Sequence, residues 1–392
     1  MMKSNFMDTL LDGVEVEWKA LSDVAVLKRG RVMSKGYLTE NKGNFPVFSS
    51  QTANNGMIGS INTFDFDGEY VNWTTDGANA GTVFYRTGKF SITNVSGLIK
   101  IKNESILSYK YLFYWLSIEA KKHVYSGMGN PKLMSNQVAK ILIPIPPLNV
   151  QEEIVRILDT FTELTAELTA ELTARQKQYN YYREQLLTFE EGEVEWKALG
   201  DVTLRTSNIN WKDTNATYRY IDLTSVCREK NTIIETTEIS AENAPSRAKK
   251  LVAMDDVIFA TTRPTQQRLC LISEEFSGEI ASTGYCVLRA RKTVVSPKWI
   301  YFFITSSRFK NYVEENESGS AYPAISDTKV KEFEIPVPSL MEQERITSIL
   351  DKFETLTTSI TEGLPREIEL RQKQYEYYRN MLLSFPKEEV EY

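Results

Sequence analysis

The run ATTRPTQQR at residues 260–268 offers the most specific hydrogen-bonding chemistry in the sequence. It follows the apolar run VIF and contains Pro264. Arginine can form two parallel hydrogen bonds with guanine, and glutamine can do the same with adenine. The side chains that could read base edges here are Thr262, Arg263, Thr265, Gln266, Gln267 and Arg268. An exposed turn pinned by the proline is the plainer alternative.

Two polar runs in the first half of the chain have similar chemistry. FSSQTANNG at residues 48–56 follows a predicted buried strand, and WTTDGAN at residues 73–79 lies at a strand end. Their candidates for base contact are Ser50, Gln51, Thr52, Asn54, Thr74, Thr75 and Asp76, with Asn55 beside them. A basic cluster suited to phosphate comprises Lys28, Arg29, Arg31 and Lys35. The alternative for the two polar runs is an ordinary polar turn, and the alternative for the basic cluster is a solvated face.

Catalytic side chains do not occur in any familiar arrangement. The sequence has no N/D-P-P-Y/F motif, no F-x-G-x-G loop, no phosphate loop and no PD…(D/E)xK pattern. His123 is the sole histidine, and the cysteines at 227, 270 and 286 are too scattered for a zinc site. We therefore expect no catalytic residue, metal or cofactor on this chain.

Charge is distributed unevenly along the 392 residues, whose total is −6. Residues 19–143 carry 15 Lys+Arg against 8 Asp+Glu, a balance of +7, whereas residues 197–335 carry 19 against 18, a balance of +1. The remaining segments carry 12 against 26, a balance of −14. Because polyanion binding depends on local potential, the acidic total does not exclude it, although ordinary surface variation also explains the difference.

Several features favour a cytoplasmic protein. No apolar run of about 18 residues suggests a membrane span. The first residues lack the basic and apolar regions of a signal peptide. Three cysteines without paired spacing fit a reducing compartment.

The chain is an internal repeat. VEWKALSDV at residues 16–24 recurs as VEWKALGDV at 194–202, and PIPPLNVQEEIVRILDTF at 144–161 recurs as PVPSLMEQERITSILDKF at 336–353. RQKQYNYYREQLLTF at 175–189 recurs as RQKQYEYYRNMLLSF at 371–385. The start, LLDGVEVEW at 10–18, also matches the ends of both helical segments. We therefore expect a pseudo-symmetric, circular repeat whose termini lie near each other.

The repeated segments at 144–196 and 336–392 are predicted to be long helices. Prolines end the preceding runs, glutamates follow in the first turns, and apolar residues recur with 4-3 spacing, as in a coiled coil. The first helix contains ELTAELTAELTA at 163–174, whose four-residue unit adds about 6 Å of helix. The second is four residues longer between its motifs, and Gly363 and Pro365 predict a kink or break there.

The remaining blocks, residues 19–143 and 197–335, read as mixed α/β domains, with residues 1–18 completing the repeat. EYVNWTTDG at 69–77 aligns with DDVIFATTRP at 255–264. SGMGNPKLMSNQV at 126–138 aligns with SGSAYPAISDTKV at 318–330, which adds Lys132 and Tyr322 as weaker DNA-contact candidates. The predicted fold is α+β: two tandem domains separated by two long antiparallel coiled-coil helices with pseudo-two-fold symmetry.

This combination of paired motifs resembles the specificity subunits of type I restriction–modification systems over essentially the whole chain. The resemblance implies two target-recognition domains, each of which reads one half of a split DNA sequence. It also implies that two methyltransferase subunits and a restriction or motor subunit assemble with the chain. S-adenosylmethionine would then be bound by the methyltransferase subunits, and a TAEL unit would set the gap between half-sites.

The RQKQYxYYR segments are candidates for docking the methyltransferases. Their candidate residues are Tyr179, Tyr182, Arg183, Tyr375, Tyr378 and Arg379. Intramolecular packing is the more common role for tyrosines at this spacing. Two alternative hypotheses for the whole chain remain: a coiled-coil scaffold with two protein-binding domains, and an enzyme with an unfamiliar site.

Overall fold

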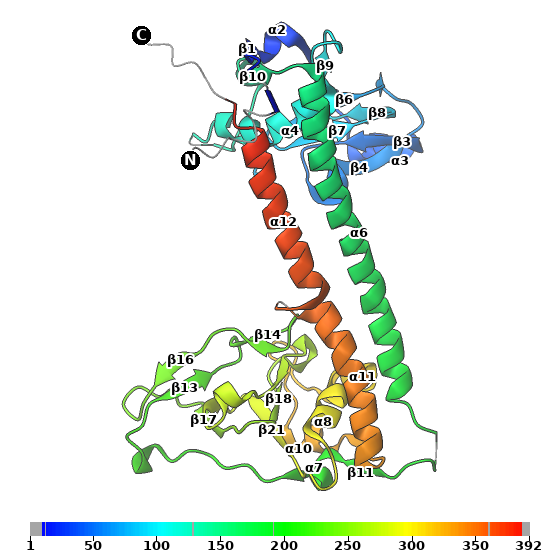
Figure 1. Cartoon of the computed structure of the whole chain (residues 1–392). Coiled ribbons are helices and arrows are strands. Elements are labelled where there is room, and N and C mark those ends of the chain that lie inside the picture. Colours follow the sequence, from blue (N-terminus) through cyan, green and yellow to red (C-terminus); the bar gives the residue numbers. More distant parts are fainter. Residues whose placement is uncertain (1–9, 12, 128, 191, 360, 386–392) are drawn as a thin grey trace. The chain divides into compact units, whose positions relative to one another are not determined.

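The computed structural model describes residues 10–11, 13–127, 129–190, 192–359 and 361–385. The chain forms two compact units, residues 1–166 with 370–392 and residues 167–369. Each unit contains one globular domain and part of the helical segments (Figure 1). The domain boundaries expected from the sequence remain predictions.

The first domain is built on two four-stranded sheets. One is antiparallel, with the order β2 (Ala25–Arg29), β9 (Ser96–Ile101), β6 (Tyr70–Thr74) and β7 (Val83–Arg86). The other has the order β4 (Met57–Ile61), β3 (Lys42–Phe48), β8 (Lys89–Ile92) and β5 (Phe66–Asp67), with β3 and β8 parallel. Strand β1 (Glu17–Ala20) pairs with β10 (Leu142–Ile145). The short helices are α2 (Leu21–Val24), α3 (Lys35–Glu40), α4 (Tyr109–Glu119), α5 (Ser135–Val138), η1 (Ala53–Gly56) and η2 (Ala120–His123).

The second domain repeats this topology strand for strand. Its antiparallel sheet is β12 (Thr203–Leu204), β21 (Tyr285–Ala290), β18 (Val257–Ala260) and β19 (Leu269–Leu271). Its mixed sheet is β16 (Thr237–Ile239), β13 (Tyr218–Ile221), β20 (Ile280–Ser282) and β17 (Ala248–Leu251), with β13 and β20 parallel. Strand β11 (Trp196–Ala198) pairs with β22 (Glu334–Pro336). The two domains therefore share one scaffold.

Further short elements complete the second domain. Strands β14 (Val226–Cys227) and β15 (Thr232–Ile233) form a hairpin that has no counterpart among the described strands of the first domain. The helices are α7 (Leu199–Val202), α8 (Pro297–Ile304), α9 (Ser307–Asn316), α10 (Asp327–Glu332), η3 (Trp211–Asp213), η4 (Pro264–Gln266) and η5 (Glu274–Phe276).

A buried glutamine ties each domain to its long helix. Gln151, on the first turn of α6 (Leu148–Leu186), is 0% exposed. Its side-chain oxygen accepts from the backbone of Ser108 at 3.0 Å, and its nitrogen donates to the carbonyls of Ile106 and Pro146, each at 2.8 Å. Gln343, on α11 (Leu340–Thr358), forms the equivalent three bonds. Both amides are thus fully used for joining helix to domain.

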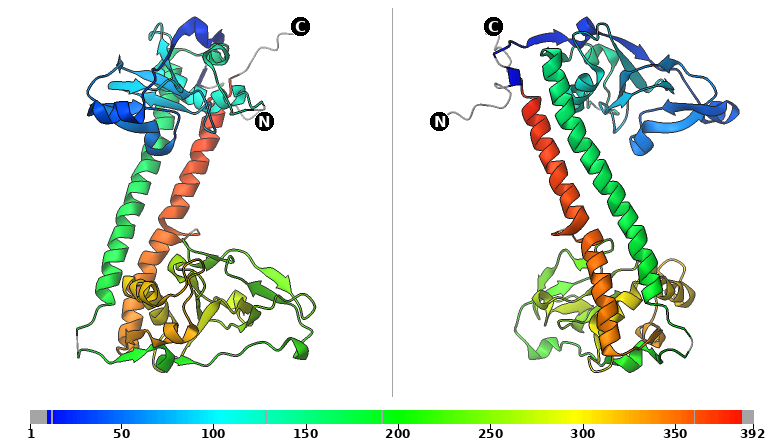
Figure 2. Two further views of the ribbon diagram at one scale, coloured as in Figure 1. Left: turned by 180° about the vertical axis from the view of Figure 1, so that it is seen from behind. Right: turned by 45° about the vertical axis from the view of Figure 1, so that its right-hand side comes forward.

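Helix α6 is a single unbroken helix of 39 residues (Figure 2). Ile154 and Leu158 are 0% exposed in the first unit, and Tyr179 is 8% exposed in the second. Between them, the TAEL repeats place no fully buried residue. The junction between the units falls at residues 166 and 167, inside the repeat. The TAEL repeat is therefore the least packed part of the helix.

The second helical segment is divided into α11 and α12 (Gly363–Leu382). Gly363 has φ +76°, and a Cβ there would lie 2.5 Å from the carbonyl oxygen of Thr355. Only glycine fits this close approach. Because one helix ends at Thr358 and the next begins at Gly363, the break predicted from the insertion is confirmed. Aromatic stacking joins the helices: Phe161 with Tyr378 in the first unit and Tyr179 with Phe353 in the second.

The predicted proximity of the termini falls on residues 1–9 and 386–392, which lie outside the described residues. Among the described residues just inside these two ends, Leu11 belongs to the same apolar core as Leu382, Leu383 and Phe385. The described segments that flank both ends thus belong to the first unit.

Replacing Gln343 with alanine is expected to lower the free energy of unfolding by about 2 kcal/mol or more, because buried backbone groups of Ser296, Val294 and Pro338 would lose their partner. Urea unfolding of the full chain measures the loss. Glu344→Ala, on the exposed side of the same turn, is the control and should change stability by less than about 0.5 kcal/mol. Equal losses for both variants would contradict a structural role for the buried amide.

Candidate nucleic-acid interface

Hydrogen bonds join three polar loops of the first domain. The Asn79 side chain donates to the carbonyl of Ser50 at 3.3 Å, which connects the loop after β6 to the loop after β3. The backbone of Asp76 forms a bridge with that of Lys132, which brings in the loop before α5. The loops that the sequence singled out are therefore contiguous on this domain.

A buried arginine supports the tip of the first loop. Arg86, on β7, is 3% exposed and donates to the carbonyl of Asn55 at 2.7 Å and to the side chain of Asn72 at 2.8 Å. Its guanidinium lies 3.7 Å from the ring centroid of Phe48 and 4.4 Å from that of Phe84. Burial lowers the pKa of Arg86 to about 10. Sequence reasoning missed this residue because alternation along a strand gives no sign of which loop its side chain holds.

Arg86 holds a strained segment. Asn54 and Asn55 both have positive φ, +49° and +51°, in the left-handed region that non-glycine residues rarely adopt and asparagine tolerates best. The side chains of Asn54 and Thr52 are exposed at this tip and stay candidates for base contact. Gln51 instead donates to the carbonyl of Met57 at 2.6 Å, so its amide nitrogen stabilises the loop from inside.

The burial of Thr74 and Thr75 contradicts the prediction that they contact bases. Both are 0% exposed. Thr74 donates to the carbonyl of Asn79, and Thr75 donates to the carboxylate of Asp76 at 2.5 Å. Their hydroxyls are not accessible to an external ligand in this structure. They lie at the buried end of β6 and support the loop from inside the domain, so neither side chain is placed to contact a base directly.

The basic residues predicted to bind phosphate differ in the contacts that they make within the domain. Arg29 donates to Thr75 and to the carbonyl of Asn94, which places it beside the three loops. Arg31 forms an ion pair with Asp65, with 3.0 Å between Nε and Oδ2. This contact reduces the charge that Arg31 could offer to phosphate. Lys28 and Lys35 are exposed, as are Lys132 and most of the first loop. Ser50 is half-buried, as is Asp76.

In the second domain, the loop after β18 has the same backbone frame. Thr262 bridges Ala324, as Asp76 bridges Lys132 in the first domain. The amide of Arg263 donates to the carbonyl of Pro323 at 2.7 Å, and that of Gly77 donates to Pro131 at 3.0 Å. These matched contacts confirm the alignment of the loops at 126–138 and 318–330. They shift the other alignment by one residue, because Thr75 and Asp76 correspond to Thr261 and Thr262, whereas matching the two Thr-Thr pairs by sequence places Thr74 and Thr75 there.

The frame presents Arg263 and Tyr322 together at the surface. Arg263 has φ +50°, and its guanidinium lies 5.3 Å from the ring centroid of Tyr322. Tyr322 is 72% exposed. Two exposed groups that can each contact a base, one by paired hydrogen bonds and one by its ring, thus come from different loops.

The rest of this loop is half-buried and partly engaged. Arg268 donates to the carbonyl of Val226 at 2.6 Å and to Gln266 at 3.4 Å. Gln267 donates to the carbonyl of Pro264 at 3.2 Å. Arg268 and Gln266 therefore help to fix the loop. The Thr265 side chain makes no hydrogen bond to another described residue.

The family comparison also finds a repeated domain. A model described as "Type I restriction modification DNA specificity domain" matches residues 13–175 and again residues 192–370. The chain belongs to this family of type I specificity subunits.

One relative matches this specificity subunit over its whole length, and another matches part of it. The specificity subunit of the type I restriction enzyme EcoR124I/EcoR124II of Escherichia coli is 34% identical over 100% of this chain and 99% of that protein. That of the type I restriction enzyme MpnII of Mycoplasma pneumoniae is 42% identical over 43% of this chain and 52% of that protein. The crystal structure of the S subunit from M. genitalium has a TM-score of 0.61 at 14% identity, covering 96% and 98% of the two chains, and therefore shares the fold.

The tyrosines predicted to dock methyltransferases differ in exposure according to their position in the motif. Tyr179 and Tyr375 pack inward, and arginines 183 and 379 lie over their rings at 5.4 and 5.5 Å. Tyr182 and Tyr378 stack on Phe353 and Phe161 and are 39% and 37% exposed. The most exposed rings are Tyr181 and Tyr377, at 60% and 65%. These two lie outside the 4-3 seam, so the sequence pattern did not include them among the predicted docking residues.

The specificity subunit has one histidine and three cysteines. Among the described residues, no cluster of three or more His, Cys, Asp or Glu could hold a metal ion. Cys270 and Cys286 are buried, and burial raises the pKa of each thiol to about 12. His123 lies 3.1 Å from Glu119 on the surface. No described helix combines the length and apolar character needed to cross a bilayer.

Arg86→Met is expected to speed hydrogen exchange of the amides around Asn55 and to lower stability by about 1–3 kcal/mol, because Asn55 and Asn72 lose a buried donor. Exchange monitored by mass spectrometry on the full chain measures the effect. Arg31→Met, which removes a surface ion pair, is the matched control and should cost less than about 1 kcal/mol. Unchanged exchange at residues 50–56 would show that Arg86 does not hold the loop.

Proposed function

We propose that this chain is the non-catalytic DNA-reading subunit of a type I restriction–modification assembly and that it recognises a split target. Each domain would read one half-site through the loops described above. The observation that carries this proposal is the pair of domains with identical strand topology and unlike loops. A shared frame with different side chains suits two different half-sites.

The length of helix α6 would set the spacing between the two half-sites. In the proposed arrangement, α6 forms an antiparallel coiled coil with α11 and α12, and the two domains are related by a pseudo-two-fold axis. The aromatic contacts support this direction: Phe161 meets Tyr378 late in the second segment, whereas Tyr179 meets Phe353 early in it. Adding helix between these contacts would then change the separation of the domains.

Partner subunits would supply the chemistry. The chain itself would bind no cofactor, and two methyltransferase subunits would carry S-adenosylmethionine and methylate adenine. The equivalent exposure of Tyr181 and Tyr377 supports two equivalent docking sites, one in each unit. A restriction or motor subunit would join the same assembly for cleavage.

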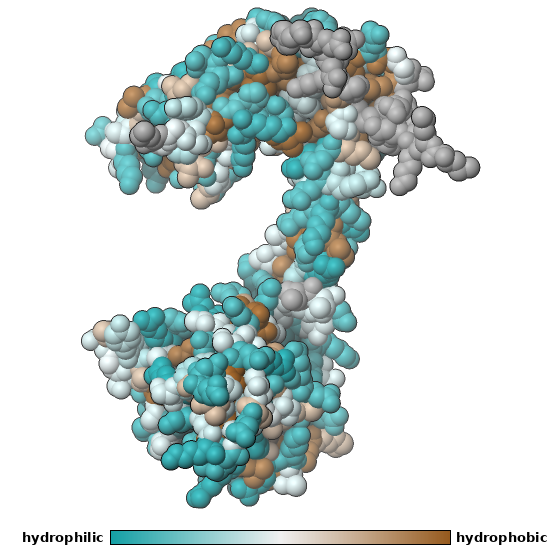
Figure 3. Space-filling model, turned by 90° about the vertical axis from the view of Figure 1, so that its left-hand side faces the viewer, coloured by the Kyte–Doolittle hydropathy of each residue, from teal (hydrophilic) through white to brown (hydrophobic). Residues whose placement is uncertain are grey.

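The alternative is a scaffold whose domains bind proteins. On the face shown in Figure 3, hydrophilic residues cover most of the second domain, and apolar residues at the surface are dispersed. Stable protein interfaces usually need a larger apolar patch. Arg263 is better suited to a base edge than to such an interface, which favours DNA reading.

Methylome sequencing of cells that carry this chain with its methyltransferase subunits tests the proposal. We expect a motif of two defined halves separated by an unread gap. Arg263→Ala should change the preference at one base of one half, at a cost of about 1–3 kcal/mol, because a bidentate contact is lost.

The control is Arg291→Ala, an exposed arginine that directly follows β21 at the end opposite the reading loop. It should leave both halves unchanged. Loss of affinity for every sequence alike in Arg263→Ala would show that this arginine anchors phosphate and does not read a base. A methylome without any split motif would contradict the proposed function itself.

Inserting one TAEL unit after Ala174 should lengthen the preferred gap while both half-sites stay the same. The unit adds about 6 Å and about 40° of rotation to α6, and the repeat has no fully buried residue to misplace. The preferred gap is measured by competition among duplexes that differ only in spacer length. A four-residue insertion after Asn215, in an exposed loop of the second domain, is the control. An unchanged gap after the helical insertion would refute the spacer role.

A further inference from the structure

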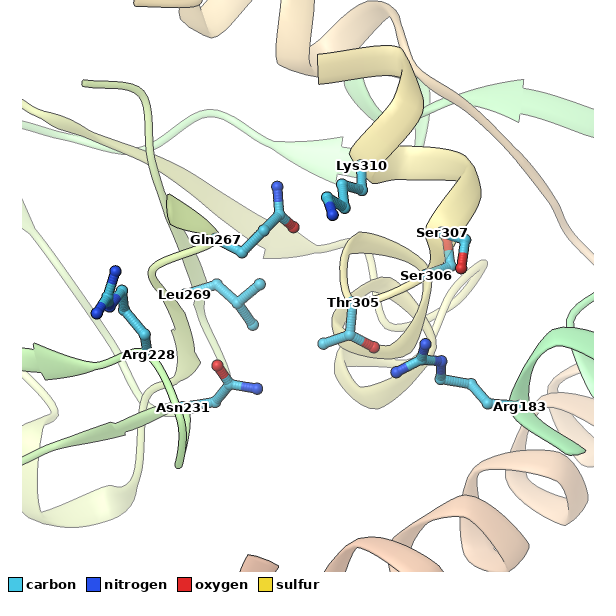
Figure 4. Close-up of a pocket in the computed structure, with 9 residues that line it drawn as sticks. All are labelled: Arg183, Arg228, Asn231, Gln267, Leu269, Thr305, Ser306, Ser307 and Lys310. Atoms are coloured by element: carbon cyan, nitrogen blue, oxygen red, sulfur yellow. The ribbon is translucent and has the colours of Figure 1, made fainter. Parts of the chain in front are cut away.

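A basic pocket of about 210 Å³ lies in the second unit, beside the reading loop. It is bordered by the end of α6, the turn between β14 and β15, the end of η4 and the junction of α8 with α9 (Figure 4). The residues that line it are Arg183, Arg228, Asn231, Gln267, Leu269, Thr305, Ser306, Ser307 and Lys310. Gln267 thus belongs both to the pocket and to the predicted base-reading run.

Three cationic side chains and no acidic one line this pocket. Lys310 is 54% exposed and lies 3.9 Å from Glu314, and Arg228 is 48% exposed and lies 3.6 Å from Glu229. Both separations exceed hydrogen-bond length, so these groups retain donors for a ligand. Arg183 is only 15% exposed and bonds to Glu184 at 3.0 Å, so it adds charge from the pocket wall.

Neutral donors complete the lining. In Figure 4, the carboxamide of Gln267 and the amine of Lys310 point toward each other across the opening, and Asn231 faces it from the hairpin. The start of α9 is already engaged, because Ser307 donates through its amide and its hydroxyl to Glu184. Gln267 and Asn231 already donate one N–H each, to Pro264 at 3.2 Å and to Tyr301 at 3.3 Å, so the cations carry most of the binding capacity.

We propose that this pocket binds a backbone phosphate of the DNA strand whose bases meet the loop at residues 262–268. The inference rests on the proposed function and adds an anchoring site to it. Phosphate contacts fix the position and register of a protein on the duplex, and a cationic pocket next to a reading loop would do so here. Lysine and arginine donors suit a phosphate oxygen, and the sharing of Gln267 places anchor and reader side by side.

The test measures binding of the full chain, assembled with methyltransferase subunits, to a cognate split duplex between 0.05 and 0.2 M salt. Lys310→Gln and Arg228→Gln should each reduce the slope of log affinity against log salt by about one. Across that range, one lost contact weakens the salt effect by about threefold. Lys310→Arg should restore the slope, and preference between base sequences should not change.

Lys292→Gln is the matched control, because Lys292 pairs with Asp255 near the opposite end of β18. It should leave the slope unchanged. If the wild-type assembly discriminates cognate from scrambled duplex but the pocket variants keep its slope, the pocket proposal is wrong and the proposed function stands. Failure of the wild type to discriminate removes both.

Inorganic phosphate distinguishes a strand phosphate from a free anion. At constant ionic strength, phosphate should compete weakly for DNA binding by the wild type and less by Lys310→Gln. Thermal stabilisation by phosphate, together with unchanged salt slopes in both variants, would identify a free-anion site and overturn the assignment to DNA.

Discussion

The structure depends on one helix that contributes to two cores. Residues Ile154 and Leu158 of α6 are buried in the first unit, and Tyr179 is buried in the second. A continuous helix is stiff and rises about 1.5 Å per residue, so its length is a physical quantity that both units share. Neither core depends on the TAEL repeats between them, because these repeats bury no residue completely and contribute no side chain to either core.

Buried polar groups fix the shared frame, and exposed polar groups differ between the copies. Gln151 and Gln343 make the same three hydrogen bonds in their own units. Leaving a buried amide unpaired is costly, so such a group tolerates only one arrangement of its neighbours. Arg263 occupies the backbone position of Gly77, where no such demand applies. Divergence is therefore expected at the loops and not beneath them.

Sequence reasoning succeeded where a rule depends on the backbone. The break at Gly363 follows from a steric limit, and the matching of the loops at 73–79 and 260–268 follows from repetition of a strand pattern. It failed where the direction of a side chain decides. Thr74 and Thr75 occupy a strand end, yet both turn into the domain and bond to their own loop.

The tyrosine motif shows the same limit on a helix. A 4-3 period identifies the seam between the helices, and it therefore selects Tyr179 and Tyr375, which pack inward. Tyr181 and Tyr377, which directly precede Tyr182 and Tyr378 in the motif, lie off this seam and are the most exposed of the six tyrosines. Arg86 was missed for a different reason: its partners Asn55 and Phe48 come from another sheet and loop, and no local pattern reveals such a contact.

The acidic total is compatible with a DNA reader because the excess of acid lies outside the two domains, and part of it is paired along the helices. Glu153 pairs with Arg156 at 2.6 Å, and Glu342 pairs with Arg345 at 2.7 Å, each three residues apart on one helix face. Such pairs produce little field beyond a Debye length of about 8 Å. The cations of the basic pocket lack acids in its lining. A polyanion would therefore experience the local lining far more than the net charge of −6.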